Sequence, residues 1–210
     1  MIGPTGVGKT ELARSIANML GYTFIKLNID FSNPQLVKGL VWGTVDGSLG
    51  PGSGNKGFLE ETEGQSNVML LIDEIGFMPE AIQQNLFDFM MTKEYVVQGD
   101  PTPRKFLGKI CYVGDYQREN SQFDVNMKRR IDEMCCCIGL YYLKHRVLDI
   151  GLSFEYLLDK ALKKRKIHSI GYEEEIIHEL QKMELESNLT DIKNFIESCD
   201  LTKPIITLND

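Results

Sequence analysis

The sequence has 210 residues, of which 42% are hydrophobic and 25% are charged, which is ordinary for a globular protein of one domain with or without a small appendage. The net charge of −7 excludes the basic surface of a general nucleic-acid binder. No apolar run approaches the roughly 18 residues of a membrane span, and the five cysteines contain no Cys-x-x-Cys pair of a zinc site. We expect a cytoplasmic protein.

The opening of the chain carries a phosphate-binding pattern. Residues 3–10 read G-x-x-x-x-G-K-T, and helical spacing follows over 10–20 with Leu12, Ile16 and Met19 on one face. Glycines at this spacing let backbone N–H groups approach phosphate oxygens, and the N-terminal end of the following helix favours negative charge. The residues that we assign to nucleotide binding are Gly3, Pro4, Thr5, Gly6, Val7, Gly8, Lys9, Thr10 and Glu11.

Two acidic residues close an apolar run further along the chain. The stretch V-M-L-L-I-D-E over 68–74 has the composition of a buried parallel strand. At the end of such a strand, Asp73 is placed to hold Mg²⁺ and Glu74 to polarise the attacking water. In the phosphate loop, Lys9 reaches the β- and γ-phosphates and Thr10 supplies a second metal ligand. The combination favours hydrolysis of ATP over binding alone, with ATP and Mg²⁺ as the cofactors.

The remaining periodicities predict an α/β fold. Apolar runs alternate with helical spacing up to about residue 140, which is typical of a parallel sheet with helices on both faces. Helical segments without a predicted strand follow and indicate a small helical lid. We therefore divide the chain into an α/β nucleotide-binding subdomain at 1–139 and a lid at 140–210. Strands are predicted at 22–29, 68–74, 109–113 and 134–140, and helices at 10–20, 79–91, 149–164, 172–183 and 189–198.

Several segments, taken together, resemble one known family. The chain is similar to the AAA+ central domain of sigma-54-dependent transcription activators, which is a P-loop ATPase fold. The resemblance covers essentially the whole chain and keeps the family's order of motifs. Its segments are FIKLNI, LLIDEIGFMPEAIQQNLFDFM, EYVVQGDP, LKHRVLDI, SNLTDIKNFIE and PIITLND.

The resemblance implies further site residues and partners. Asn28 matches the residue that senses the nucleotide by pairing with Glu74, and Arg130 matches an arginine finger that acts on a neighbouring subunit, with Arg129 as a substitute. The family relation implies self-association into a ring, expected to be a hexamer. It also implies ATP-driven remodelling of a protein partner in transcription regulation, which in this family is RNA polymerase sigma-54.

Four positions depart from the family pattern. The sigma-contacting loop G-A-F-T-G-A is replaced by WGTVDGSLGPG, in which Leu49 stands near the Phe position and no Thr follows it. Thr190 replaces the lid arginine that contacts nucleotide, Asp124 replaces the first of two paired arginines, and Asp115 lies at a sensor position. These changes leave open a second interpretation, a nucleotide-binding regulatory module that has lost hydrolysis or sigma-54 contact.

A third interpretation is an unfoldase ATPase of the Clp type, because GPTGVGKTELA and RRIDE resemble that class. No aromatic pore loop precedes the acidic strand, and the lid is more similar to the activators. Only Met1 and Ile2 precede the phosphate loop, so we expect a truncated first strand, which a truncated gene, a late-assigned start or a fragment of a longer protein would each explain. Nothing in the sequence predicts a direct DNA-binding element or a membrane contact.

Overall fold

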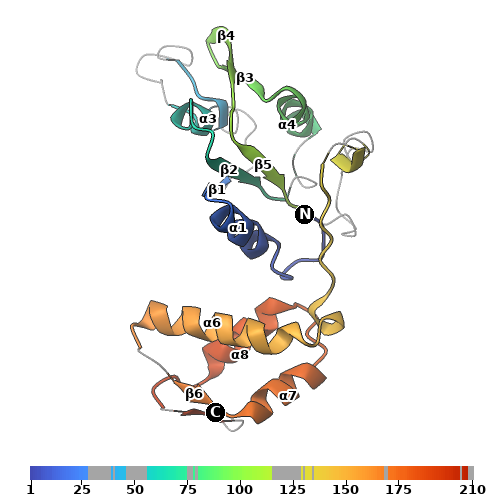
Figure 1. Cartoon of the computed structure of the whole chain (residues 1–210), viewed down its shortest axis with the longest axis vertical. Helices are drawn as coiled ribbons and strands as arrows, with labels where there is room; N and C mark the ends of the chain where they lie inside the picture. The colour runs from blue at the N-terminus through green and yellow to red at the C-terminus, as the bar shows by residue number, and fades with distance from the viewer. Residues whose placement is uncertain are drawn as a thin grey trace. The chain divides into compact units, whose positions relative to one another are not determined.

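The computed structural model forms two compact units (Figure 1). One contains Met1–Ile2 and Thr10–Ile138, and the other contains Gly3–Lys9 and Gly139–Asp210. One boundary between the units therefore falls between Lys9 and Thr10, inside the phosphate-loop motif. The sequence pattern did not indicate this boundary. The structure describes residues 1–27, 39, 41–45, 56–74, 78, 80–114, 129, 131–133, 135–167, 170–203 and 205–207.

The first unit is built on a parallel sheet. Its strand order is β1-β2-β5, and all pairings are parallel, as predicted for an α/β fold. The central strand is apolar throughout and every one of its residues is buried, because neighbours flank it on both edges and both faces. The strands are β1 (Thr23–Leu27), β2 (Val68–Ile72) and β5 (Lys109–Tyr112).

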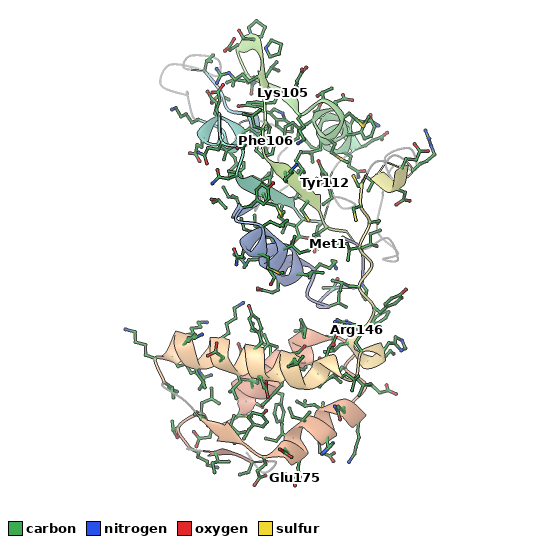
Figure 2. All side chains as sticks on the ribbon, viewed as in Figure 1. Met1, Lys105, Phe106, Tyr112, Arg146 and Glu175 are labelled. Atoms are coloured by element: carbon green, nitrogen blue, oxygen red, sulfur yellow. The ribbon has the colours of Figure 1, made fainter. Side chains whose placement is uncertain are left out.

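The first two residues of the chain extend this sheet beyond β5. The Met1 amino group donates to Tyr112 O at 2.6 Å, and Ile2 forms a parallel bridge with Gly114. Figure 2 labels Met1 and Tyr112 where they meet. The Ile2 N–H donates to Ile138 O at 2.9 Å.

The strand predicted at 134–140 is wrong as an element, since its described residues, 135–140, form no named strand.

Helices cover both faces of the sheet. Val68, Leu70 and Ile72 of β2 share a core cluster with α4 (Glu80–Thr92), whereas Leu71 packs with Ala13 of α1 (Lys9–Met19). Successive strand residues point to opposite faces, so α1 and α4 lie on opposite sides.

The apolar face predicted for α1 is only partly the buried one, because Leu12 and Ile16 are half-buried. Met19 is 86% exposed, and the buried residues of this helix are Ala13 and Ala17. Their small side chains let the helix backbone approach the sheet closely.

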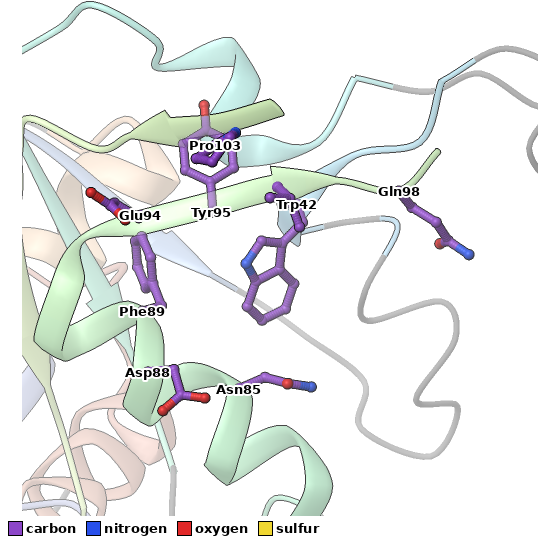
Figure 3. A pocket seen from close by; sticks show the side chains of 9 residues that line it. Trp42, Asn85, Asp88, Phe89, Glu94, Tyr95, Gln98 and Pro103 are labelled. Atoms are coloured by element: carbon purple, nitrogen blue, oxygen red, sulfur yellow. The ribbon is translucent and has the colours of Figure 1, made fainter. Parts of the chain in front are cut away.

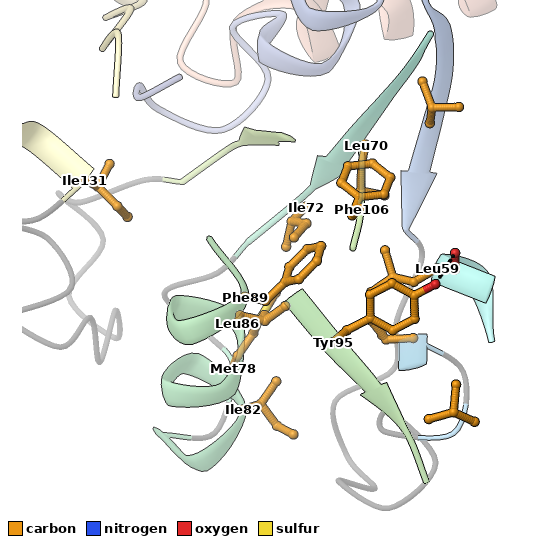
Figure 4. Close-up of a cluster of buried hydrophobic side chains, with 13 residues drawn as sticks. Leu59, Leu70, Ile72, Met78, Ile82, Leu86, Phe89, Tyr95, Phe106 and Ile131 are labelled. Carbon is orange, nitrogen blue, oxygen red and sulfur yellow. Dashed lines mark hydrogen bonds between the residues drawn. The ribbon is translucent and has the colours of Figure 1, made fainter. Parts of the chain in front are cut away.

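A hairpin and a short helix close the first core (Figure 4). Strands β3 (Glu94–Val97) and β4 (Asp100–Lys105) are antiparallel, and Tyr95 packs into the cluster with α3 (Phe58–Glu61). The Tyr95 hydroxyl donates to Leu59 O at 3.1 Å, so this buried polar group is satisfied.

The second unit has its own core. Helices α6 (Asp149–Arg165), α7 (Glu174–Lys182) and α8 (Leu189–Ser198) bury apolar residues against one another. A two-residue parallel pair, β6 (Gly171–Tyr172) with β7 (Ile205–Ile206), lies in this unit and was not predicted. The 3-10 helix η2 (Leu143–His145) precedes α6. Of the helices that the structure describes, none has the length and apolarity to cross a membrane.

The core of the second unit gives a test of its packing on α6. Leu158 is 4% exposed, whereas Leu152 on the same helix is 70% exposed. Leu158→Ala should lower the free energy of unfolding by about 2–5 kcal/mol, because it removes buried methyl groups and leaves a cavity. Leu152→Ala should change it by less than about 0.5 kcal/mol. Urea denaturation followed by circular dichroism measures both, and equal effects would contradict the packing of α6.

Candidate nucleotide-binding site

The phosphate loop needs glycine at its centre. Gly6 has φ +79°, a left-handed conformation that is strained for most residues. A Cβ added at Gly6 would collide with Ser187 O and meet Thr190 Oγ1 at 3.2 Å. Gly8 has φ +100° and a similar restriction. The glycines of the motif are thus required by conformation and by close approach of the loop to residues 187–190.

Three consecutive loop carbonyls accept hydrogen bonds within the second unit. Thr5 O accepts from the Asn188 side-chain amide at 3.0 Å, and Gly6 O accepts from the Leu189 N–H at 3.0 Å. Val7 O accepts from Arg146 Nη2 at 3.1 Å. These bonds define the direction of each peptide plane in the loop.

The opposite side of these peptide planes presents N–H groups. In a trans peptide the C=O of one residue and the N–H of the next point in opposite directions, and no cis peptide occurs among the described residues. The N–H groups of Gly6, Val7 and Gly8 therefore point away from the partners of the preceding carbonyls. Helix α1 begins at Lys9, so its N-terminal end follows directly. Consecutive N–H groups before a helix N-terminus have the chemistry of an anion site.

Lys9 folds back on the loop. Its Nζ donates to Gly3 O at 2.7 Å and to Pro4 O at 2.8 Å. The ammonium is thereby held beside the loop rather than extended along α1.

The Glu11 carboxylate, two residues further on, forms an ion pair with Arg14 at 3.7 Å. Because both side chains of that pair are largely exposed, it contributes little to stability.

The Asp73 carboxylate lies at the carboxyl end of β2 in the first unit. Its Oδ2 is 3.5 Å from Thr10 Oγ1 and 2.6 Å from Lys26 Nζ. Its Oδ1 accepts the Glu74 N–H at 3.0 Å. The carboxylate is 20% exposed and Lys26 is 33% exposed, so this ion pair is partly shielded from water.

Glu74 has an uncommon backbone conformation. Its φ is +53°, in the left-handed region where residues other than Gly and Asn are rare. Such conformations cost of the order of 1–3 kcal/mol and cluster at functional sites. The side chain is exposed, so it is open to contact with water.

Of seven other positions named from the sequence, the structure describes two. Asn28 and Arg130 lie outside the described residues, as do Leu49, Asp115 and Asp124. Arg129 is described, and its guanidinium pairs with Glu133 at 2.6 Å on an exposed surface. Thr190 is exposed near the start of α8.

Three further residues at this site were not predicted from the sequence. Lys26 pairs with Asp73, and Asn188 and Arg146 hold the phosphate loop. Asn188 is 1% exposed, has φ +59° and also accepts the Leu143 N–H at 2.7 Å. Asn is a common residue at the start of a helix, but the side-chain partners of Asn188 lie more than 40 residues away. Lys26 could have been suspected, because β1 and β2 are parallel and end at the same sheet edge.

The donor set of Thr10 and Asp73 fits a hard divalent cation. Mg²⁺ prefers oxygen ligands and takes one or two carboxylates together with phosphates and waters. The described residues contain no group of three or more acidic, His or Cys side chains that could hold a metal alone. A hydroxyl and a carboxylate are therefore compatible with a magnesium ion that enters with a nucleotide.

A separate cavity of about 640 Å³ lies in the first unit (Figure 3). Trp42 enters it beside Tyr95 of β3, and the rim is formed by α4 and the hairpin. Trp42 also packs against the first core. The cavity shares no residue with the phosphate loop. Its lining residues are Trp42, Asn85, Asp88, Phe89, Glu94, Tyr95, Val96, Gln98 and Pro103.

The sheet order, the phosphate loop and the acidic strand end define the class. The chain has an α/β P-loop fold of the AAA+ type. Residues 1–128 match the family described as the Sigma-54 interaction domain, and the chain belongs to this family. The resemblance inferred from the motifs is thereby confirmed.

Two of the sequence relatives are described as transcriptional regulatory proteins. The alginate biosynthesis transcriptional regulatory protein AlgB of Pseudomonas putida is 24% identical over 212 residues, covering 97% of this chain and 46% of AlgB. AlgB of Pseudomonas syringae has the same identity and coverage. The chain thus spans less than half the length of these relatives.

Solved structures share the fold. NtrX from Brucella abortus in complex with ADP superposes with a TM-score of 0.74 at 19% identity, covering 99% of this chain and 47% of NtrX. NtrX in complex with ATP gives a TM-score of 0.70 at 19% identity over 93% of this chain.

One sequence relative is of another kind. The ATP-dependent protease ATPase subunit HslU of Pseudothermotoga lettingae is 24% identical over 190 residues, covering 80% of this chain and 38% of HslU.

The role of Asn188 can be tested by stability. Asn188→Ala removes the acceptor of the buried Leu143 N–H and should lower the free energy of unfolding by about 1–3 kcal/mol. Asn188→Gly also removes the side-chain hydrogen bonds, but glycine adopts the positive φ of residue 188 without strain. The difference between the two variants therefore separates the loss of hydrogen bonds from the strain of the backbone. Asn194→Ala on α8 is the exposed control and should have a small effect. Urea denaturation measures the free energy of unfolding of all three variants. A loss of stability no larger at residue 188 than at residue 194 would contradict the role of the Asn188 hydrogen bonds.

Proposed function

We propose that the chain is an ATP-binding, ATP-hydrolysing AAA+ module that couples turnover to remodelling of a protein partner in transcription regulation. The observation that carries this proposal is the carboxyl end of β2, where Asp73 lies beside the Thr10 hydroxyl. The orientation of the loop N–H groups adds support, since it suits a polyphosphate. Membership of the sigma-54 interaction family supports the regulatory role.

The residues take the following roles in the proposal. The loop N–H groups and Lys9 bind the phosphates, and Thr10 and Asp73 hold Mg²⁺. Bound Mg²⁺ would neutralise charge that develops on the phosphate oxygens. Glu74 orients and polarises the attacking water.

A neighbouring copy completes the proposed site. Arg130 stabilises the transferred phosphoryl group from the next subunit of a ring, expected to be a hexamer, and Asn28 reports the nucleotide state to Glu74. We place this assembly in the cytoplasm, where RNA polymerase sigma-54 is the partner proposed from the family.

Hydrolysis is tested at Glu74. Glu74→Gln keeps the shape and removes the base, so ATP turnover should fall by roughly 10²–10⁴-fold while binding of Mg·ATP remains. Lys9→Ala should instead lose binding, because its ammonium contacts the phosphates. Glu61→Gln, an exposed change on α3, is the control. Phosphate release and calorimetry are the two measurements, and unchanged turnover in Glu74→Gln would refute its catalytic role.

Contact with sigma-54 separates this proposal from a regulatory module that only binds nucleotide. The altered contact loop, Thr190, Asp115 and Asp124 favour that second candidate. We expect the Glu74→Gln variant, loaded with ATP, to capture purified sigma-54, and the same variant without nucleotide to release it. A pull-down measures both states. ATP binding without any capture would favour the second candidate.

A further inference from the structure

One cationic side chain at the candidate metal site has no role in the function proposed above. Lys26 lies one residue before the end of β1, in register with Leu71 of β2, two residues before Asp73. Because the strands are parallel, the Lys26 side chain reaches the edge where Asp73 follows β2. Its Nζ lies 2.6 Å from Asp73 Oδ2, which is a short charge-assisted contact.

Lys26 contacts the same carboxylate oxygen that faces the Thr10 hydroxyl. Asp73 Oδ2 is the oxygen 3.5 Å from Thr10 Oγ1, and Oδ1 already accepts the Glu74 N–H. The Lys26 ammonium therefore contacts the same carboxylate oxygen that a divalent cation would approach beside the Thr10 hydroxyl. A divalent cation at this oxygen would also meet an ammonium of like charge at close range, and like charges in a partly shielded site repel.

We propose that Lys26 is the resident counter-ion of Asp73 and sets how strongly this site binds a divalent cation. The ammonium satisfies the carboxylate when no metal is bound. Binding of Mg²⁺ then requires Lys26 to leave Oδ2, which weakens metal affinity and makes nucleotide binding less dependent on Mg²⁺. This inference rests on the proposed binding of nucleotide at the phosphate loop, and it adds a residue that determines metal affinity.

The consequence is a measurable coupling between nucleotide and metal. By linkage, the ratio of the Kd for ADP in EDTA to the Kd in excess Mg²⁺ reports how much the two ligands favour each other. Lys26→Met removes the charge and keeps an unbranched apolar stem, so Mg²⁺ meets an unpaired carboxylate. The ratio should rise about tenfold, which corresponds to about 1.4 kcal/mol of coupling.

Matched variants distinguish the local contact from a general loss of charge. Lys26→Arg keeps a cation at the end of β1 and should keep the wild-type ratio. Lys109→Met removes an exposed cation from β5 of the same sheet and should also keep it. Lys26→Gln serves in place of Lys26→Met if the latter does not give the wild-type circular dichroism spectrum.

Calorimetry with ADP on the full chain, in EDTA and in excess Mg²⁺, decides the matter. A ratio that rises in Lys26→Met alone supports the inference. If ADP binds and the ratio in Lys26→Met is unchanged or lower, the inference is overturned while the proposed function stands. If the wild-type chain takes up no ADP in either buffer, the proposed function fails and the role of Lys26 fails with it.

Discussion

The direction of three peptide planes in the phosphate loop is the constraint on which the candidate site depends. The carbonyls of Thr5, Gly6 and Val7 each accept a hydrogen bond from a donor beyond residue 139. A planar trans peptide cannot turn its carbonyl one way without turning the following N–H the other way. The orientation of the loop N–H groups, on which the proposed anion binding depends, is thus set by residues outside the loop. One of these, Asn188, is buried and held in a left-handed conformation.

The second requirement is a rigid support for Asp73. Strand β2 is apolar and buried along its whole length, between β1 and β5 and between α1 and α4. Protein interiors are densely packed, so a residue that directly follows such a strand has little freedom. Glu74 comes next and has a positive φ, so the backbone strain lies at the residue that we propose as the catalytic base. The core of the first unit therefore positions the acids and does more than stabilise the fold.

Much of this arrangement was predictable because it is local in sequence. The continuous apolar run of β2 predicts a buried parallel strand, and the glycine spacing predicts a loop that approaches another group closely. The burial of Ala13 and Ala17 in place of Met19 was missed, because helical periodicity favours large side chains and takes no account of how near a helix lies to a sheet. Pairing of Met1 and Ile2 beside β5 was also beyond a periodicity argument, since two residues carry no period.

Long-range contacts account for the rest of what was missed. Lys26 and Asp73 are 47 positions apart, and Asn188 and Thr5 are 183 apart. No spacing rule connects such residues until the strand register and the loop conformation are known. Lys26 was visible in the motif FIKLNI, but only as an unassigned position between two apolar residues. Parallel strands that end at one edge make such a pair plausible, and the register of β1 on β2 is what makes it specific.

The ion pair between Lys26 and Asp73 has opposite effects on stability and on the proposed function: it stabilises the first unit and weakens the binding of a cation. A partly buried carboxylate without a partner is costly, so the pair stabilises the first unit when no cation is bound. The same contact opposes a cation at Oδ2, because two positive charges cannot share that oxygen without repulsion. Functional sites often retain polar or charged groups whose interaction partner is the ligand, and the protein without ligand is then less stable. Here the chain supplies its own substitute for the ligand, so the site without metal is not a destabilised site.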